Sequence, residues 1–239
     1  MLSAMPPPGE VLLVVGVAWA AGTAVFAAFT RVGGQVDPGH FKVCWLVVAG
    51  LAAAFSFAGD RAWPAWVLAG AALLAYLAIY RRLDHLVGVA AALAGVGSLV
   101  ATVPSADPRA WAVAGGTAWL LGAVTNAMLL GHWHLNQPRL GTGPLRRLVW
   151  LLWAGLVVFV AAAAAMVVSS WGDGSTAGFA GVTGIAFAVF TAVLTAMVHH
   201  LVKTRSIMSA TGILYLAVLL CFVSAFTGVL GALSLGRLA

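Results

Sequence analysis

Hydrophobic residues fill eight long blocks of this chain, and polar residues gather in the short stretches between the blocks. A helix needs roughly 20 apolar residues to cross the ~30 Å hydrocarbon layer of a membrane, and each block has about that length. Because a backbone amide in lipid must find its hydrogen bond within its own segment, the blocks predict helices. The predicted membrane spans are residues 11–30, 41–59, 63–80, 86–103, 111–131, 148–170, 178–202 and 207–235.

The stretches between the blocks hold turn-forming residues, such as Asp37-Pro38-Gly39 after the first block. None of these stretches is long enough to be a soluble domain. The expected fold is therefore all-α, a single polytopic membrane bundle of eight transmembrane helices over residues 1–239. Its two halves of four helices would run in the same direction, but they share residue-level similarity only in the Pro, Gly and His residues of the first and fifth loops.

Composition strengthens the membrane prediction. Of the 239 residues, 63% are hydrophobic and 8% are charged, whereas soluble domains have about 25% charged residues. The formal net charge is +6, but the basic residues form no tract, so we expect membrane lipid as a partner and no nucleic acid. Cys44 and Cys221 both lie inside hydrophobic blocks and are interpreted as small packing residues.

The basic residues are distributed unequally between the two ends of the predicted bundle. Nine lie at one end: Arg31, Lys42, Arg81, Arg82, Arg139, Arg146, Arg147, Lys203 and Arg205. Three lie at the other end: Arg61, Arg109 and Arg237. Cytoplasmic loops carry the excess of Lys and Arg, so the first end is predicted to be cytoplasmic and both termini to lie on the outer, non-cytoplasmic side. The expected location is a bacterial-type inner (plasma) membrane.

All six histidines fall at the same end as the nine basic residues, because each lies where an odd-numbered block ends or an even-numbered block begins. They are His40, His85, His132, His134, His199 and His200. Imidazole binds metals and haem and exchanges protons near neutral pH. The one-sided arrangement predicts a cofactor site on the cytoplasmic side. The alternative interpretation is a set of interfacial histidines without a cofactor.

His132, His134 and His199 are the predicted metal ligands, and His85 and His200 are further candidates for binding a cofactor. The small residues of the seventh block lead at helical spacing to His199, so His199 should point into the bundle and His200 toward solvent or headgroups. If the fifth helix continues through His132, that ring also points inward. If the chain is extended there, His132 and His134 fall on the same side and could chelate one ion.

Other polar residues are candidates for supporting such a site or for contacting lipid headgroups. Asn126 lies roughly 9 Å deeper than His132 at about 1.5 Å per residue, where an amide usually hydrogen-bonds a neighbouring helix. Tyr80 and Arg81 are typical of an interfacial anchor. Asp84 could orient a histidine, and His40 is placed in the same supporting group.

No catalytic motif is present, and the residues do not decide whether the chain is an enzyme. Carboxylates are absent from the spans, which argues against a carboxylate-based pump. The first functional hypothesis is a membrane subunit of an electron-transfer system that binds haem b, a transition metal or a quinone and joins other subunits of a redox complex. The alternatives are a small-solute or proton-linked transporter and a non-catalytic scaffold or assembly subunit.

Overall fold

The computed structural model describes residues 5–81, 83–103, 107–137, 139–170 and 176–235. Within these residues all regular structure is helical, and eight helices are long and apolar enough to cross a membrane. The predicted all-α, multi-pass fold is thereby confirmed. The helices are α1 (Pro8–Val32), α2 (Pro38–Ser56), α3 (Trp63–Ala78) followed by the short 3-10 helix η1 (Ile79–Arg81), α4 (Asp84–Thr102), α5 (Pro108–Trp133), α6 (Gly143–Ser169), α7 (Thr176–Lys203) and α8 (Ile207–Leu235).

Several helices begin earlier than the hydrophobic pattern predicts, because prolines occupy their first turns. Proline lacks an N–H that the first turn would leave unbonded, and its fixed φ suits a helix start. The second and fifth predicted spans, 41–59 and 111–131, therefore begin after the helices themselves do, since α2 begins at Pro38 and α5 at Pro108. The eighth prediction, 207–235, matches α8 at both ends.

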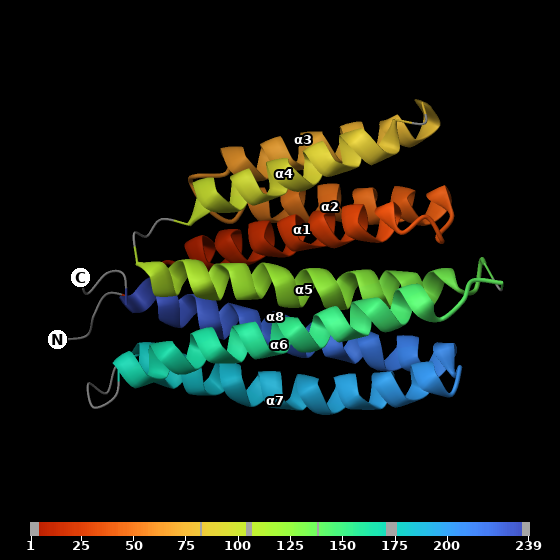
Figure 1. Cartoon of the computed structure of the whole chain (residues 1–239). Coiled ribbons are helices and arrows are strands. Elements are labelled where there is room, and N and C mark those ends of the chain that lie inside the picture. The colour runs from red at the N-terminus through yellow and green to blue at the C-terminus, as the bar shows by residue number, and fades with distance from the viewer. Residues whose placement is uncertain (1–4, 82, 104–106, 138, 171–175, 236–239) are drawn as a thin grey trace.

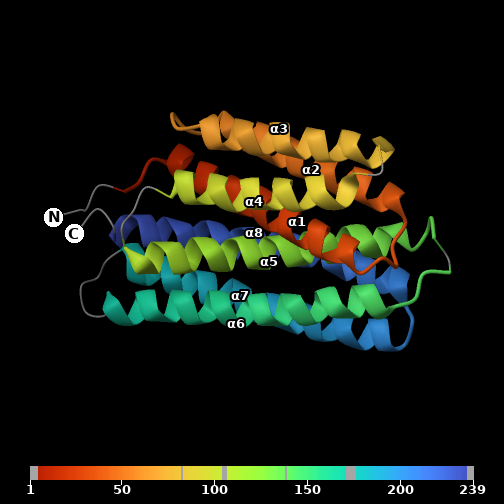
Figure 2. The same ribbon diagram turned by 45° about the horizontal axis from the view of Figure 1, so that its top comes forward.

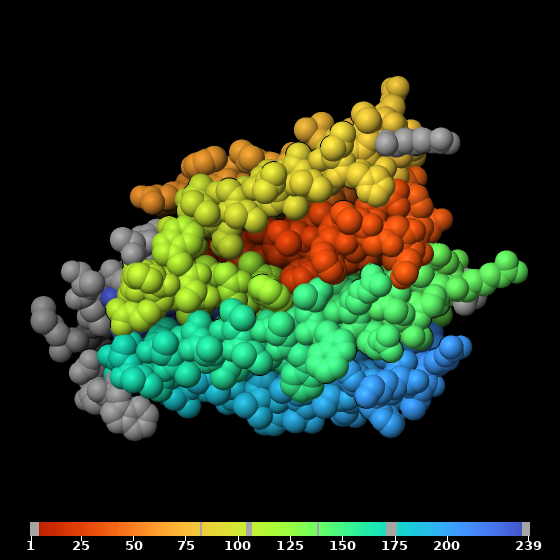
Figure 3. All heavy atoms as spheres, viewed as in Figure 1, coloured from red at the N-terminus to blue at the C-terminus, as the bar shows by residue number. Residues whose placement is uncertain are grey.

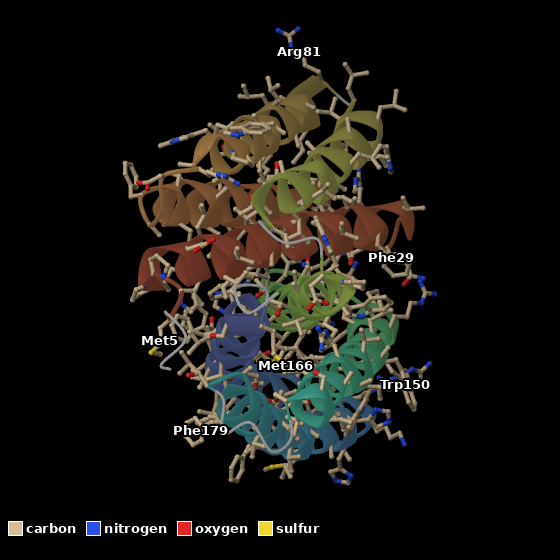
Figure 4. All side chains as sticks on the ribbon, turned by 90° about the vertical axis from the view of Figure 1, so that its left-hand side faces the viewer. Met5, Phe29, Arg81, Trp150, Met166 and Phe179 are labelled. Carbon is tan, nitrogen blue, oxygen red and sulfur yellow. The ribbon has the colours of Figure 1, made fainter. Side chains whose placement is uncertain are left out.

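The eight helices form two bundles of four, α1–α4 and α5–α8, which lie side by side (Figures 1 and 2). Within each bundle the helices follow a ring in chain order, and the fourth helix closes the ring against the first. An end-on view shows the two bundles stacked, with α1 and α5 at their junction (Figure 4). The halves thus share a helix arrangement that residue-level similarity did not reveal, because packing order depends on which faces are apolar or small rather than on particular residues.

The junction of α1 with α5, here called the seam, is a close backbone contact. A Cβ atom added at Gly22 would lie 1.7 Å from the carbonyl oxygen of Ala118, and one added at Gly122 would lie 2.3 Å from the backbone carbon of Gly22. Only glycine permits such an approach. α2 and α8 flank the seam on one side, where α2 touches α5 and α8 touches α1, while α4 and α6 flank the other side.

The alternating helix directions give the bundle two distinct ends (Figure 1). The described residues nearest the two termini lie at one end, here called the terminal end. The other, here called the histidine end, holds the α1–α2, α5–α6 and α7–α8 connections and all six histidines. The helix ends that carry the six histidines therefore lie at one end of the bundle, as the sequence predicts.

Candidate site at the histidine end

The three predicted metal ligands do not form a cluster. Among the described residues, no group of three or more His, Cys, Asp or Glu side chains is placed to hold a metal ion. His199 lies between α6 and α7, where its ring meets the Trp150 ring edge-on with centroids 5.0 Å apart. His132 and His134 lie at the end of α5, in the seam region. The structure therefore does not support a metal site made by these three histidines.

The inward direction predicted for His132 is wrong. α5 continues through Trp133, so the extended arrangement that would let His132 and His134 chelate one ion does not form either. Successive helical residues turn by about 100°, which puts these two rings on different sides of the helix. At this end the buried face of α5 runs through Asn126 and Leu130, and His132 is exposed.

The outward direction predicted for His200 agrees with the structure, because His200 is exposed. The inward direction predicted for His199 is realised only in part, because the ring is half-buried and packs on the exposed Trp150, while its Nδ1 is shielded from solvent and has no hydrogen-bond partner among the described residues. His85 is exposed at the start of α4. His85 lies on α4, whereas His199 and His200 are neighbours on α7, and the described residues form no group of three or more possible metal ligands that includes them.

Asp84 forms an ion pair rather than orienting a histidine. The carboxylate is buried and accepts a hydrogen bond from Nε of Arg31, whose guanidinium also lies 5.3 Å from the centre of the Phe41 ring. A buried carboxylate is stabilised far more by a full cation than by a neutral imidazole. The role of Asp84 is therefore to join α4 to α1 through this ion pair.

Tyr80 and Arg81 lie at the outer edge of the first bundle, away from the seam. Tyr80 is exposed, with the Tyr76 hydroxyl 3.3 Å from its own hydroxyl and the Lys42 ammonium 3.9 Å from the centre of its ring. Arg81 projects from the edge of the bundle (Figure 4). This position suits the interfacial anchor that the sequence predicts for the pair.

His40 is the deepest of the six imidazoles, and it was predicted only as a supporting residue. Its exposed fraction is 1%. Nε2 lies 3.3 Å from Sγ of Cys44, one helical turn further along α2, and that thiol lies 3.9 Å from Oδ1 of Asn126. The amide oxygen can only accept, so the Cys44 thiol donates its S–H to Asn126 Oδ1. The sulfur atom in turn accepts a hydrogen bond from the Nε2–H of His40. His40 Nδ1 then carries a free lone pair.

The amide of Asn126 ties this chain of polar groups to the seam. Its Nδ2 donates to the carbonyl oxygens of Thr23 on α1 at 3.1 Å and of Gly122 on α5 at 2.9 Å. This is the inter-helix hydrogen bond predicted for the residue. Beside it, Nε1–H of Trp19 donates to Oγ1 of Thr125 at 2.7 Å. The polar groups thus extend from the histidine end to the middle of α1.

His134 presents a second buried nitrogen without a partner. Its Nδ1 lies 2.8 Å from the carbonyl oxygen of Leu130, which makes Nδ1 the donor and leaves the lone pair of the neutral ring on Nε2. Nε2 is shielded from solvent and has no partner among the described residues. His134 also lies close enough to His40 for the charges of two protonated rings to repel each other.

The indole of Trp133 completes this group. Its ring packs on His40 with centroids 5.8 Å apart, and it covers Gly39, where an added Cβ would lie 2.9 Å from the indole. Its Nε1–H is buried and has no acceptor among the described residues. We call His40, Trp133 and His134 the seam cluster. It offers two imidazole lone pairs and one N–H, all shielded from water.

A sequence signal for His40 was available. Pro38 at the first position of α2 places His40 in the first helical turn, and Cys44 follows four residues later on the same face. Interpreting Asp37-Pro38-Gly39 as a loop instead put His40 among the headgroups. Its approach to α5 could not be predicted from the sequence.

No family model matches this chain, and neither a curated protein nor a solved structure matches it. The chemistry of the site itself is therefore the basis for assigning a function.

Proposed function

We propose that this protein is the membrane subunit of an electron-transfer system and that it binds a quinol or quinone headgroup at the seam cluster. The observation that carries the proposal is a pair of buried imidazole nitrogens, His40 Nδ1 and His134 Nε2, beside the buried indole N–H of Trp133, none of which has a hydrogen-bond partner within the part of the chain that the structure describes. Buried polar atoms are normally hydrogen-bonded, and each one left alone costs about 1–3 kcal/mol. A ligand that satisfies all three atoms recovers this cost.

A hydroquinone has the matching chemistry. Its two hydroxyl groups donate to the lone pairs of His40 and His134, and one of its oxygens accepts from Trp133 Nε1–H. On oxidation the two O–H protons pass to these imidazoles one after the other, the first leaving before the second is accepted because two protonated rings would repel each other, and two electrons leave for two oxidised one-electron centres on another subunit. Quinone is the product, and Trp133 Nε1–H still donates to one of its oxygens. Water is kept out because the ring of Trp133 lies over Gly39 and His40.

The same proposal includes an orientation. The basic residues of the histidine end outnumber those of the terminal end, which supports a cytoplasmic histidine end and outer termini in a bacterial-type inner membrane. The partners are then further subunits of a membrane redox complex that carry the electron-accepting centres. The protons released from His40 and His134 would leave on the cytoplasmic side.

Titration calorimetry tests the proposal. It measures how tightly the detergent-purified protein binds a short-tailed quinone and the corresponding quinol. Trp133→Phe keeps the aromatic ring and removes its N–H, and His134→Phe removes one lone pair. We expect each change to weaken binding roughly fivefold to tenfold, the value of about one hydrogen bond. The controls are His85→Ala and His200→Ala, which change exposed imidazoles at the same end.

Two results would contradict quinone as the ligand. One is wild-type protein that binds neither form. The other is a haem spectrum or a stoichiometric metal in the purified protein that disappears in His134→Phe. Haem b needs only two axial imidazoles, and a transition metal could add the thiol of Cys44, so optical and elemental analysis of the same sample separates these cofactors from quinone.

A second candidate function, a proton-linked transporter of small solutes, is favoured by one observation. A cavity of about 570 Å³ at the terminal end has Glu10, Asp60 and Arg61 among its lining residues. The chain of polar groups that runs from Trp19 to His40 occupies the other half of the bundle, toward the histidine end. Between them the Trp19 and Phe55 rings pack 6.5 Å apart. Solute uptake by vesicles containing the protein, abolished by Asp60→Asn together with Arg61→Gln, would favour this function.

A further inference from the structure

An apolar groove runs along the α4/α6 flank of the seam, on the side opposite the seam cluster. Its volume is about 440 Å³, and α1, α4, α5 and α6 all contribute to its walls. Figure 3 shows this flank, where α1 is visible between α4 and the pair α5 and α6. Every lining residue is apolar or aromatic, and the single indole N–H, that of Trp119, is already bound to the carbonyl oxygen of Leu151 at 2.8 Å. The groove therefore suits a hydrocarbon chain.

The groove leads to a second cavity at the histidine end, whose lining is mostly apolar but includes several polar side chains. Phe29 lines both spaces, and Figure 4 shows this side chain on the outside of the flank. The second cavity measures about 190 Å³ and is lined by Thr30, Gly33, Gln35 and Arg147 among others. The Arg147 guanidinium lies beside Gly33, and no carboxylate of the described residues pairs with it. Within the described ranges, a cation without a carboxylate partner thus lies at the mouth of an apolar groove.

The length of the combined space matches one leaflet of a bilayer. The groove begins at Ala21 on α1, and the second cavity reaches Val32. At ~1.5 Å per residue these positions are about 16 Å apart along the helix, and half of the ~30 Å hydrocarbon layer is roughly 15 Å. A chain that starts at Arg147 would therefore end near the middle of the membrane.

We propose that an anionic phospholipid of the leaflet at the histidine end occupies this space. Its phosphate binds Arg147 in the second cavity, and one acyl chain lies in the groove against Phe29 and Trp119. The lipid contacts both four-helix bundles and covers the flank of the seam that no other helix crosses. The positive charge at the mouth selects an anionic headgroup over a zwitterionic one, and the one-leaflet length suits an acyl chain.

Native mass spectrometry of the full chain with added phosphatidylglycerol or phosphatidylcholine tests the proposal. We expect one tightly bound phosphatidylglycerol, and about fivefold weaker binding in Arg147→Gln, as expected for loss of one cation near the membrane surface. Arg81→Gln is the matched control, because Arg81 also lies at the histidine end but on the far edge of the first bundle.

A second pair of variants tests the groove itself. A Cβ added at Gly115, which lines the groove, or at Gly70, which lies on α3, meets no atom within 4 Å. Gly115→Leu should fill part of the groove and lower phosphatidylglycerol occupancy several-fold, whereas Gly70→Leu should not.

Equal binding of the two phospholipids, binding unchanged in both Arg147→Gln and Gly115→Leu, or a quinone in place of the phospholipid would overturn the proposal. Quinone titration of Arg147→Gln keeps the two sites separate. The seam cluster lies on the opposite flank, so quinone affinity there should stay at the wild-type value whether or not the lipid is lost.

Discussion

Glycines at the seam show how single residues determine the contact between the two bundles. Gly22 and Gly122 face each other across α1 and α5, and neither position has room for a methyl group. Without a hydrophobic driving force between helices in lipid, such close packing is a main source of helix association. The polar atoms of Asn126 and Thr125 then bond across the same seam.

Gly22→Ala should destabilise the protein by about 3 kcal/mol, because its Cβ would overlap the backbone oxygen of Ala118 and force α1 away from α5. Gly70→Ala adds the same atom where nothing lies within 4 Å, so its stability should stay within about 1 kcal/mol of the wild type. Unfolding in mixed detergent micelles measures both values. Equal stabilities of the two variants would contradict the role given to the seam.

At the scale of the helices, aspartate followed by proline defines where two of them begin. Asp37 accepts a hydrogen bond from the N–H of Gly39 at 2.7 Å, and Asp107 accepts one from the N–H of Arg109 at 2.8 Å. Each side chain caps its helix just before a proline at the first helical position. The Asp37 cap has a functional consequence, because it places His40 in the first turn of α2, where its ring packs against Trp133.

The Asp107 cap should make the stability of α5 depend on pH. Hydrogen bonds from the side chain of Arg109 lower the pKa of Asp107 in the folded protein. A lowered pKa means that the carboxylate contributes fully above its unfolded-state pKa of about 3.9 and loses its contribution as pH falls through the folded value. Asp107→Ala should therefore cost about 1 kcal/mol at pH 7, and this difference should shrink below about pH 4.

Thermal unfolding of the wild type and the variant across this pH range measures the effect. Asp107→Asn retains a capping oxygen but loses the partly buried ion pair with Arg109, so it should cost less than the alanine change. A loss in Asp107→Ala that is independent of pH would exclude the carboxylate as its source.

At the scale of the molecule, two similar bundles meet along one pair of helices, and the two flanks of that pair differ. One flank brings α2 against α5 and encloses the seam cluster, whereas the other leaves an apolar groove open to lipid. Redox chemistry and lipid binding are therefore proposed on opposite flanks of the same seam. Both proposals depend on α1 and α5 staying in contact.

Cysteine labelling in intact cells tests the proposed orientation. The native thiols of Cys44 and Cys221 are buried, so the wild type should not react with a membrane-impermeant maleimide. Asp60 is exposed at the terminal end and His200 at the histidine end. Asp60→Cys should be labelled in intact cells and His200→Cys only after permeabilisation, as the positive-inside rule requires. The reverse pattern would place the histidine end outside.

The sequence alone was enough to predict eight membrane helices and the end at which each histidine emerges. Both follow from local physics, since an apolar block of about 20 residues must be helical in lipid and consecutive blocks must cross the membrane in opposite directions. The outward position of His200 follows from helical periodicity in the same way.

Only the tertiary structure decided which imidazoles share a site. His132 is exposed and His40 is buried because α2 packs against α5 beside the α1–α5 seam, a contact between residues far apart in the chain. Hydrophobic periodicity determines which face of a helix is buried, but it carries no information about which helix covers that face. The pairing of His40 with Trp133 and His134 is therefore a property of the packed bundle.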